Sequence, residues 1–198
     1  MPVLDRLLVL AHSVSRAAIW SGGTLVLCAA ILVAADVLMR NVFMVTFGGA
    51  DELAGYAFAI GTAWALSFTL LNRANVRVDA LYALLPPRFC AVLDIIALIA
   101  LGMFAGLLTW HAAVMLETSI SFSARATTPL QTPLWIPQSL WVAGLVVFIL
   151  TLALLFLRAV LALLGGDLAT VRRLAGARSI EENAADEIAH TATLKPLE

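Results

Sequence analysis

Four long stretches without a charged side chain constrain most strongly how this chain of 198 residues can fold. They are residues 17–35, 53–72, 95–116 and 126–157, which contain 19, 20, 22 and 32 residues. A helix needs about 20 predominantly apolar residues to cross a hydrocarbon core of about 30 Å. All four stretches qualify, so the sequence predicts an all-α integral membrane protein with four transmembrane helices.

Composition separates a membrane-embedded body from a polar tail. Apolar residues make up 62% of the chain and charged residues 13%, whereas about 25% of an ordinary soluble domain is charged. Residues 167–198 hold 10 of the 25 charges. We predict a transmembrane domain over 1–166 and a cytoplasmic tail over 167–198, in which a short amphipathic helix precedes a disordered end. The predicted spans are about 17–38, 52–72, 91–117 and 137–163.

The fourth span is predicted to begin at Pro137. Pro129 and Pro133 interrupt the earlier part of its uncharged stretch, whereas a proline in the first turn of a helix lacks only an N–H that has no helical acceptor. Residues 118–136, which lead into this span, alternate serine with apolar residues and then become rich in threonine and proline. We expect them to form an extended layer at the outer membrane surface.

Basic residues predict that both termini face the cytoplasm. Short loops rich in Lys and Arg stay on the cytoplasmic side, and four spans place ten basic residues on one side and two on the other. The ten are Arg6, Arg16, Arg73, Arg77, Arg88, Arg158, Arg172, Arg173, Arg178 and Lys195, and the two are Arg40 and Arg125. Trp110, Trp135 and Trp141 fall at the predicted outer boundary and Trp20 at the inner one, whereas Trp64 lies deeper and is expected to pack.

The connecting segments contain signals for turns and for interfacial helices. Residues 41–50 are too apolar to float in water and too few to cross the bilayer, so they are expected to lie among the lipid headgroups. Gly48 and Gly49 allow the chain to turn there. Asp51 is then expected to cap the second helix, and Glu52 to favour the positive end of its dipole.

The inner loop, residues 72–88, is predicted to contain a short helix that lies flat on the membrane. Its apolar residues fall on one helical face, namely Val78, Leu81, Tyr82 and Leu85. Asp79 lies in the first turn, where a negative charge is favourable. Arg73, Arg77 and Arg88 are placed to contact anionic lipid headgroups.

Several residues near the predicted spans have expected local roles. Asp36 and Arg40 are one helical turn apart and are expected to form an ion pair. Most charges near the span ends are expected to reach the interface, and these are Asp36, Arg40, Glu52, Asp94, Glu117 and Arg158. Cys28 and Cys90 are expected to be small buried apolar residues. Gly102 and Gly106 form a G-x-x-x-G pattern that would let another helix approach closely.

The sequence offers few residues for catalysis or cofactor binding. His111 is the one histidine inside a predicted span, so paired axial ligation of haem within the chain lacks a second ligand. We expect His111 to be a hydrogen-bonded structural or interface residue. No catalytic or phosphate-binding motif occurs in the membrane region. The near-neutral net charge of −1 disfavours nucleic acid as a partner. We expect neither enzymatic activity nor a cofactor or metal.

An ordered set of short motifs resembles one transporter family. The motifs are Arg40-Asn41-Val42-Phe43, Gly49-Ala50-Asp51-Glu52-Leu53-Ala54-Gly55-Tyr56, Asn75-Val76-Arg77-Val78-Asp79 with Leu85-Pro86, and Thr132-Pro133-Leu134-Trp135-Ile136-Pro137. Over roughly residues 17–160, the chain resembles the small membrane subunit, the DctQ-type component, of tripartite ATP-independent periplasmic (TRAP) transporters.

The resemblance implies a role as one subunit of a secondary transporter. Its partners would be a large DctM-type membrane subunit, a periplasmic solute-binding protein and the lipids of the bacterial inner membrane. A sodium gradient would drive uptake of an organic acid, and the large subunit would move like an elevator against this stationary scaffold. The residues expected to fix loop geometry or to contact partner and lipid are Arg40, Asn41, Glu52, Tyr56, Arg73, Arg77, Asp79, Arg88 and Trp135.

Two other functions remain open at the level of the sequence. The chain could anchor a redox or other membrane enzyme complex and borrow ligands from a partner. It could also be an independent small carrier or channel, although such carriers commonly show internal repeats or helices broken at mid-membrane.

Overall fold

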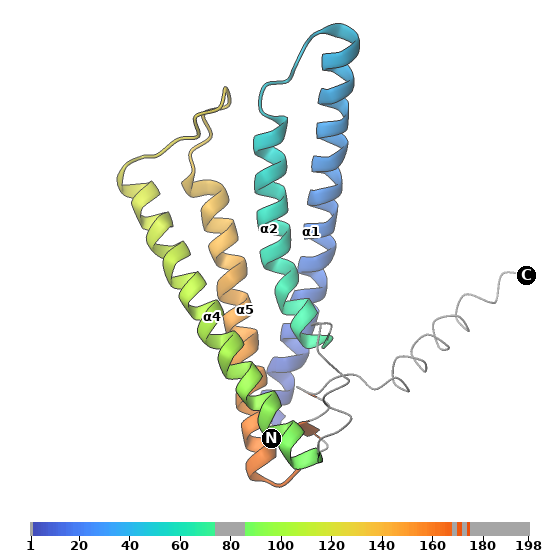
Figure 1. The fold of residues 1–198 in the computed structure, drawn as a ribbon, viewed down its shortest axis with the longest axis vertical. Helices are drawn as coiled ribbons and strands as arrows, with labels where there is room; N and C mark the ends of the chain where they lie inside the picture. The colour runs from blue at the N-terminus through green and yellow to red at the C-terminus, as the bar shows by residue number, and fades with distance from the viewer. Residues whose placement is uncertain (1, 74–85, 168–169, 172–173, 175–198) are drawn as a thin grey trace, which may run out of the picture.

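The structure is a computed structural model that describes residues 2–73, 86–167, 170–171 and 174. Its helices are α1 (Pro2–Phe43), α2 (Ala50–Leu71), α4 (Pro87–Ser121) and α5 (Trp135–Leu164) (Figure 1). Each contains a window that is long and apolar enough to cross a membrane. The chain is therefore an all-α, multi-pass membrane protein, as predicted from its four uncharged stretches.

The helices extend beyond the predicted spans. With 42, 22, 35 and 30 residues, three of them are longer than the roughly 20 residues that a bilayer requires. α5 begins at Trp135, two residues before the predicted start, and Pro137 is buried in its first turn. The segment 118–136 is less extended than predicted, because α4 continues through Ser121. The positions at which the membrane surfaces cross these helices remain a prediction.

The four helices form an open row in the order α1, α2, α5, α4. α1 packs on α2, α2 on α5 and α5 on α4, whereas α1 touches α5 only lightly. At the end that carries the loops 44–49 and 122–134, the α1–α2 pair diverges from the α4–α5 pair (Figure 1). In a row of this kind each helix keeps an uncovered side, and much of that apolar surface faces the lipid.

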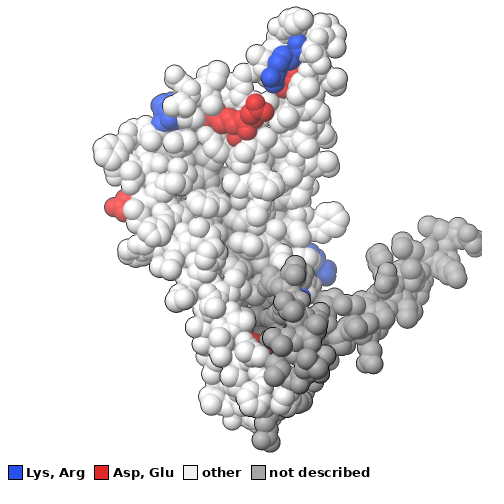
Figure 2. Space-filling view, viewed as in Figure 1, with Lys and Arg blue, Asp and Glu red and all other residues white. Residues whose placement is uncertain are grey.

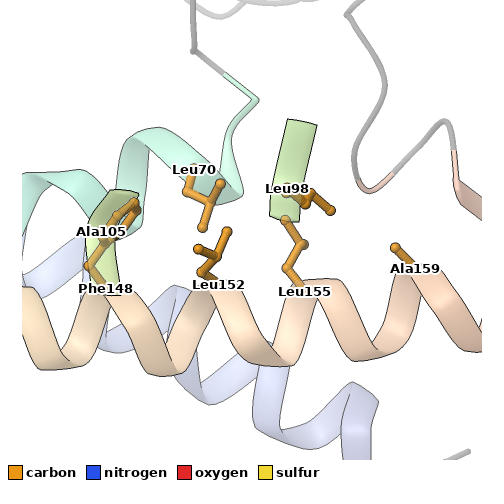
Figure 3. Packing of buried hydrophobic residues seen from close by; sticks show 7 residues of the cluster. All are labelled: Leu70, Leu98, Ala105, Phe148, Leu152, Leu155 and Ala159. Carbon is orange, nitrogen blue, oxygen red and sulfur yellow. The ribbon is translucent and has the colours of Figure 1, made fainter. Parts of the chain in front are cut away.

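A core of leucine, alanine and phenylalanine joins the two pairs. Its buried members are Leu70 from α2, Leu98 and Ala105 from α4, and Phe148, Leu152, Leu155 and Ala159 from α5 (Figure 3). α5 supplies most of these side chains and lies between α2 and α4. The visible surface around this core is largely uncharged, with charged side chains gathered mainly toward the loop end (Figure 2).

Glycines set the closest approaches between helices, although not at the predicted pair. A β-carbon on Gly22 of α1 would lie 3.1 Å from the Cα of Gly61 of α2. On α4, Gly102 faces Leu152, but a β-carbon on Gly106 would meet no atom within 4 Å. The G-x-x-x-G pattern thus marks one contact with α5 and one open position, and α1 and α2 approach most closely at glycines outside that pattern.

The turn between α1 and α2 is partly as expected. Gly48 and Gly49 have φ angles of 62° and 151°, a region that favours glycine. The prediction that Asp51 caps α2 is wrong, because Gly49 is the N-cap and no side chain caps it. Asp51 and Glu52 instead both lie in the first turn, where negative charge opposes the positive end of the helix dipole.

Two expectations for buried and exposed residues need correction. Cys28 is exposed on α1 rather than buried, while Cys90 is buried as expected. Asp94 is fully buried in α4 and does not reach an exposed surface, and Asp36 is only 3% exposed. Both carboxylates therefore depend on contacts within the protein, as buried charges in membrane helices usually do.

The chain after α5 turns back onto the helix row. Gly166 has a φ of 72°, and the Asp167 carboxylate accepts a hydrogen bond from the Thr170 backbone N–H at 3.0 Å. Val171 is fully buried against Ala91 of α4 and Ala162 of α5. The predicted helix within 72–88 and the predicted disorder at the C-terminal end lie largely outside the described residues.

The crossing of α1 and α2 predicts that substitution of Gly22 destabilises the protein more than substitution of the adjacent Gly23. Gly22→Leu should destabilise the protein by about 1–3 kcal/mol, because the new side chain meets the Gly61 backbone. Gly23→Leu is the control, since a β-carbon there has no neighbour within 4 Å and the gain in helix propensity is the same. Thermal unfolding in mild detergent measures both, and equal melting temperatures would contradict the crossing.

Candidate functional site

Asp36 holds the end of α1 to the loop that follows it. Its Oδ2 accepts a hydrogen bond from Arg40 Nη2 at 2.8 Å, the ion pair that the spacing predicts. Its Oδ1 accepts hydrogen bonds from the Thr46 hydroxyl at 2.9 Å and the Phe47 backbone N–H at 2.7 Å. One buried carboxylate thus meets three donors, which fixes the path of residues 44–49.

Glu52 forms a second polar centre at the start of α2. Its Oε1 accepts a hydrogen bond from the Tyr56 hydroxyl one helical turn later, at 2.8 Å. Its Oε2 accepts one from the hydroxyl of Thr128, a residue of the loop between α4 and α5. The carboxylate therefore joins two segments that are 76 residues apart.

Apolar contacts reinforce the link between the two loops. Leu130 lies against Gly49 so closely that a β-carbon there would be 2.3 Å from Leu130 Cδ1, and Pro129 lies over Gly48. The loop itself is held as a narrow hairpin, in which the Ala126 N–H donates to the Thr132 carbonyl at 3.0 Å. Only glycine combines the required φ with this close approach.

We call this set of contacts the loop clasp. It comprises Asp36, Arg40, Thr46, Phe47, Gly48, Gly49, Glu52, Tyr56, Thr128, Pro129 and Leu130. The α1–α2 and α4–α5 pairs diverge at the end where the clasp lies (Figure 1). The clasp therefore connects the pairs at the point where direct helix packing weakens.

The predicted site residues lie at both ends of the row and form no single site. Arg40, Glu52 and Tyr56 belong to the clasp, while Asn41 is exposed near the end of α1 and Trp135, the first residue of α5, is 48% exposed. Arg73 follows α2 at the opposite end, with a φ of 52°. Arg77, Asp79 and the side chain of Arg88 are outside the described residues.

Sequence spacing could identify only the local half of the clasp. The Asp36–Arg40 and Glu52–Tyr56 contacts both span one helical turn, and the first was predicted from that spacing. The contacts of Asp36 with residues 46 and 47 and of Glu52 with Thr128 were missed. A threonine in a loop rich in threonine and proline carries no signal for a partner 76 residues away.

Trp64 makes a further contact that the sequence did not specify. Its indole Nε1 donates to the Leu140 carbonyl of α5 at 3.0 Å, and a β-carbon on Gly144 would lie 2.9 Å from its ring. The glycine thus makes room for the indole between α2 and α5. Trp64 was expected to pack, and it also supplies a hydrogen bond between the two helix pairs.

Two grooves lie along the row, and both are lined almost entirely by apolar residues. One of about 520 Å³ lies between α1, α2 and α5, and includes Gly22, Ile60 and Trp64. The other, of about 170 Å³, lies between α4 and α5 beside Gly102. Within the described part of the chain, no three His, Cys, Asp or Glu residues are grouped as metal ligands. These surfaces suit acyl chains or other helices better than charged solutes.

The fold and the clasp define a multi-pass membrane subunit built as a braced row of helices. A family model for tripartite ATP-independent periplasmic transporters, DctQ component, matches residues 29–164. The chain belongs to this family and is a small permease subunit of a TRAP transporter. Comparisons with curated proteins and with solved structures gave no significant match.

The clasp predicts that Glu52, but not the adjacent Asp51, is needed to hold residues 124–134 against α2. Glu52→Ala should accelerate hydrogen exchange over residues 124–134 several-fold, because Thr128 loses its acceptor and the loop is released from α2. Asp51→Ala is the matched control, since it removes the same charge from the first turn but no clasp contact. Exchange followed by mass spectrometry in detergent compares them. Equal rates in the two variants would show that Glu52 does not hold the loop.

Proposed function

We propose that this chain is the stationary scaffold subunit of a sodium-coupled TRAP transporter for an organic acid. The large DctM-type subunit binds solute and sodium and moves like an elevator, while this subunit widens the part that stays fixed in the membrane. A periplasmic solute-binding protein delivers the solute. Membership in the DctQ component family supports the transporter assignment, and the finer roles are our inference.

The loop clasp is the observation that carries the scaffold role. A subunit that resists a sliding neighbour must keep its helices at fixed relative positions. The clasp supports this by joining the diverging ends of the two helix pairs through the hydrogen bonds of Glu52. Further from these loops, the two helix pairs are joined by apolar packing around Leu70, Phe148 and Leu152. The apolar grooves also suit contacts with lipid and protein rather than with a charged solute.

The proposed setting is the bacterial inner membrane with both termini in the cytoplasm. The excess of basic residues on the side that carries residues 72–88 and the tail supports this orientation. In this orientation the clasp, with Arg40, Glu52 and Tyr56, faces the periplasm beside Asn41 and Trp135. Arg73, Arg77, Asp79 and Arg88 lie on the cytoplasmic side, where they hold the inner loop or contact lipid headgroups.

Reconstitution tests whether transport depends on the other subunits. Proteoliposomes that contain only this chain should show no sodium-dependent uptake of organic acids, because the two grooves along the row are lined almost entirely by apolar residues. Adding the large subunit and the binding protein should produce uptake that stops when sodium is replaced by potassium. Uptake by this chain alone would contradict the proposal.

The inner loop should affect assembly rather than solute recognition. Arg77→Ala or Asp79→Ala should lower the yield of the two-subunit membrane complex or the uptake rate, since both residues are proposed to fix the inner loop. Solute binding to the isolated periplasmic protein should remain unchanged. Arg6→Ala, which removes a positive charge on the same predicted side, is the control. Weakened solute binding, or an equal loss from Arg6→Ala, would refute this role.

A further inference from the structure

We propose that a few residues after α5 act as a latch that holds the start of α4 against the end of α5. We call them the C-terminal latch, and they are Asp167, Thr170, Val171 and Leu174. The start of α4 and the end of α5 lie at the end of the row opposite the loop clasp (Figure 1). This inference goes beyond the proposed function, because it concerns contacts within the chain and holds whichever partner the chain has.

A hydrogen-bonded turn reverses the chain at the end of α5. The Asp167 backbone N–H donates to the Ala162 carbonyl at 2.9 Å, and the Gly166 N–H donates to the Leu163 carbonyl at 3.0 Å. Gly166 itself has a φ of 72°. This pair of hydrogen bonds around a left-handed glycine is the Schellman motif, which ends many helices. Backbone hydrogen bonds therefore fix the direction in which the chain leaves α5.

Asp167 then begins a new helical turn. Its carboxylate accepts hydrogen bonds from the Thr170 backbone N–H at 3.0 Å and from the Thr170 hydroxyl, as an N-cap residue does. Its backbone carbonyl accepts a hydrogen bond from the Val171 N–H at 3.3 Å. Thr170, Val171 and Leu174 are helical. Val171 and Leu174, which are three residues apart, therefore lie on one side of the turn.

The apolar side of the latch packs into the helix row. Val171 is fully buried and forms a small core with Ala91 of α4 and Ala162 of α5, which are 0% and 5% exposed. Leu174 packs against the larger core that contains Leu98 of α4. The latch thus contacts both members of the α4–α5 pair, and Val171 lies where the two helices present only the short side chain of alanine.

This position explains why the latch matters for α4. α4 stands at one end of the row, and its only extensive contact with another described helix is with α5. Ala91 and Ala162 bury little apolar area by themselves, whereas a buried valine adds about 1.5–3 kcal/mol of favourable transfer free energy. Val171 therefore strengthens the α4–α5 contact at the end that the loop clasp does not reach.

Thiol labelling tests whether the latch is docked in the folded protein. In a chain that carries Cys28→Ala and Cys90→Ala, Val171→Cys should react with a maleimide at least tenfold more slowly than Leu164→Cys. Val171 is fully buried, whereas the nearby Leu164 is 80% exposed. The two thiols should react at equal rates after unfolding, which controls for their intrinsic reactivity. Equal rates in the folded protein would overturn the proposal.

Hydrogen exchange tests whether the docked latch holds α4. Val171→Asp should accelerate exchange over residues 90–98 at least fivefold, because the site cannot accommodate an unpaired charge. Leu164→Asp is the control, since it places the same charge at an exposed position and should leave this exchange unchanged. If Val171→Asp does not fold, Val171→Ala should give a smaller acceleration by loss of packing. Unchanged exchange in the Val171 variants, or equal acceleration in Leu164→Asp, would show that the latch does not hold α4.

Discussion

The contact between α2 and α5 holds this molecule together, because it is the only extensive packing between the two helix pairs in the described part of the chain. Trp64 fits against Gly144 and donates to the Leu140 carbonyl, and Leu70 packs with Phe148 and Leu152 further along. Helices in a membrane gain little from burying apolar surface against each other, since lipid is equally apolar. Close fit and a hydrogen bond must therefore supply the stability.

This constraint explains why the loop clasp matters. A closed four-helix bundle braces each helix against two neighbours, whereas a row leaves its end helices, α1 and α4, with one extensive contact each. The packing at the levels of Trp64 and Leu70 lies further from the loops than Glu52 does. Glu52, which is bonded to Tyr56 and Thr128, adds an attachment at the diverging loop end. Attachments that are spread along the two helix pairs resist rotation of one pair against the other.

The sequence predicted the helices well and their assembly poorly, for a physical reason. Uncharged stretches of about 20 residues or more predict helices that cross the bilayer. Spacings of four residues predict side-chain contacts within a helix, such as Asp36–Arg40. Neither signal says which helices are neighbours. Because lipid and protein surroundings are similarly apolar, nothing distinguished exposed Cys28 from buried Cys90, or open Gly106 from the closely packed Gly22.

The hydrogen-bond partners of polar groups show which segments of the chain are joined, whereas apolar residues look alike in lipid and in protein surroundings. In hydrocarbon each donor and acceptor needs a partner. The position of that partner therefore shows whether a helix is bonded only within itself or also to another segment. Thr24 finds its acceptor within its own helix, and Glu52 finds one donor in α2 and another in the loop after α4. Lipid can therefore cover the surface around Thr24, whereas Glu52 joins two segments of the chain.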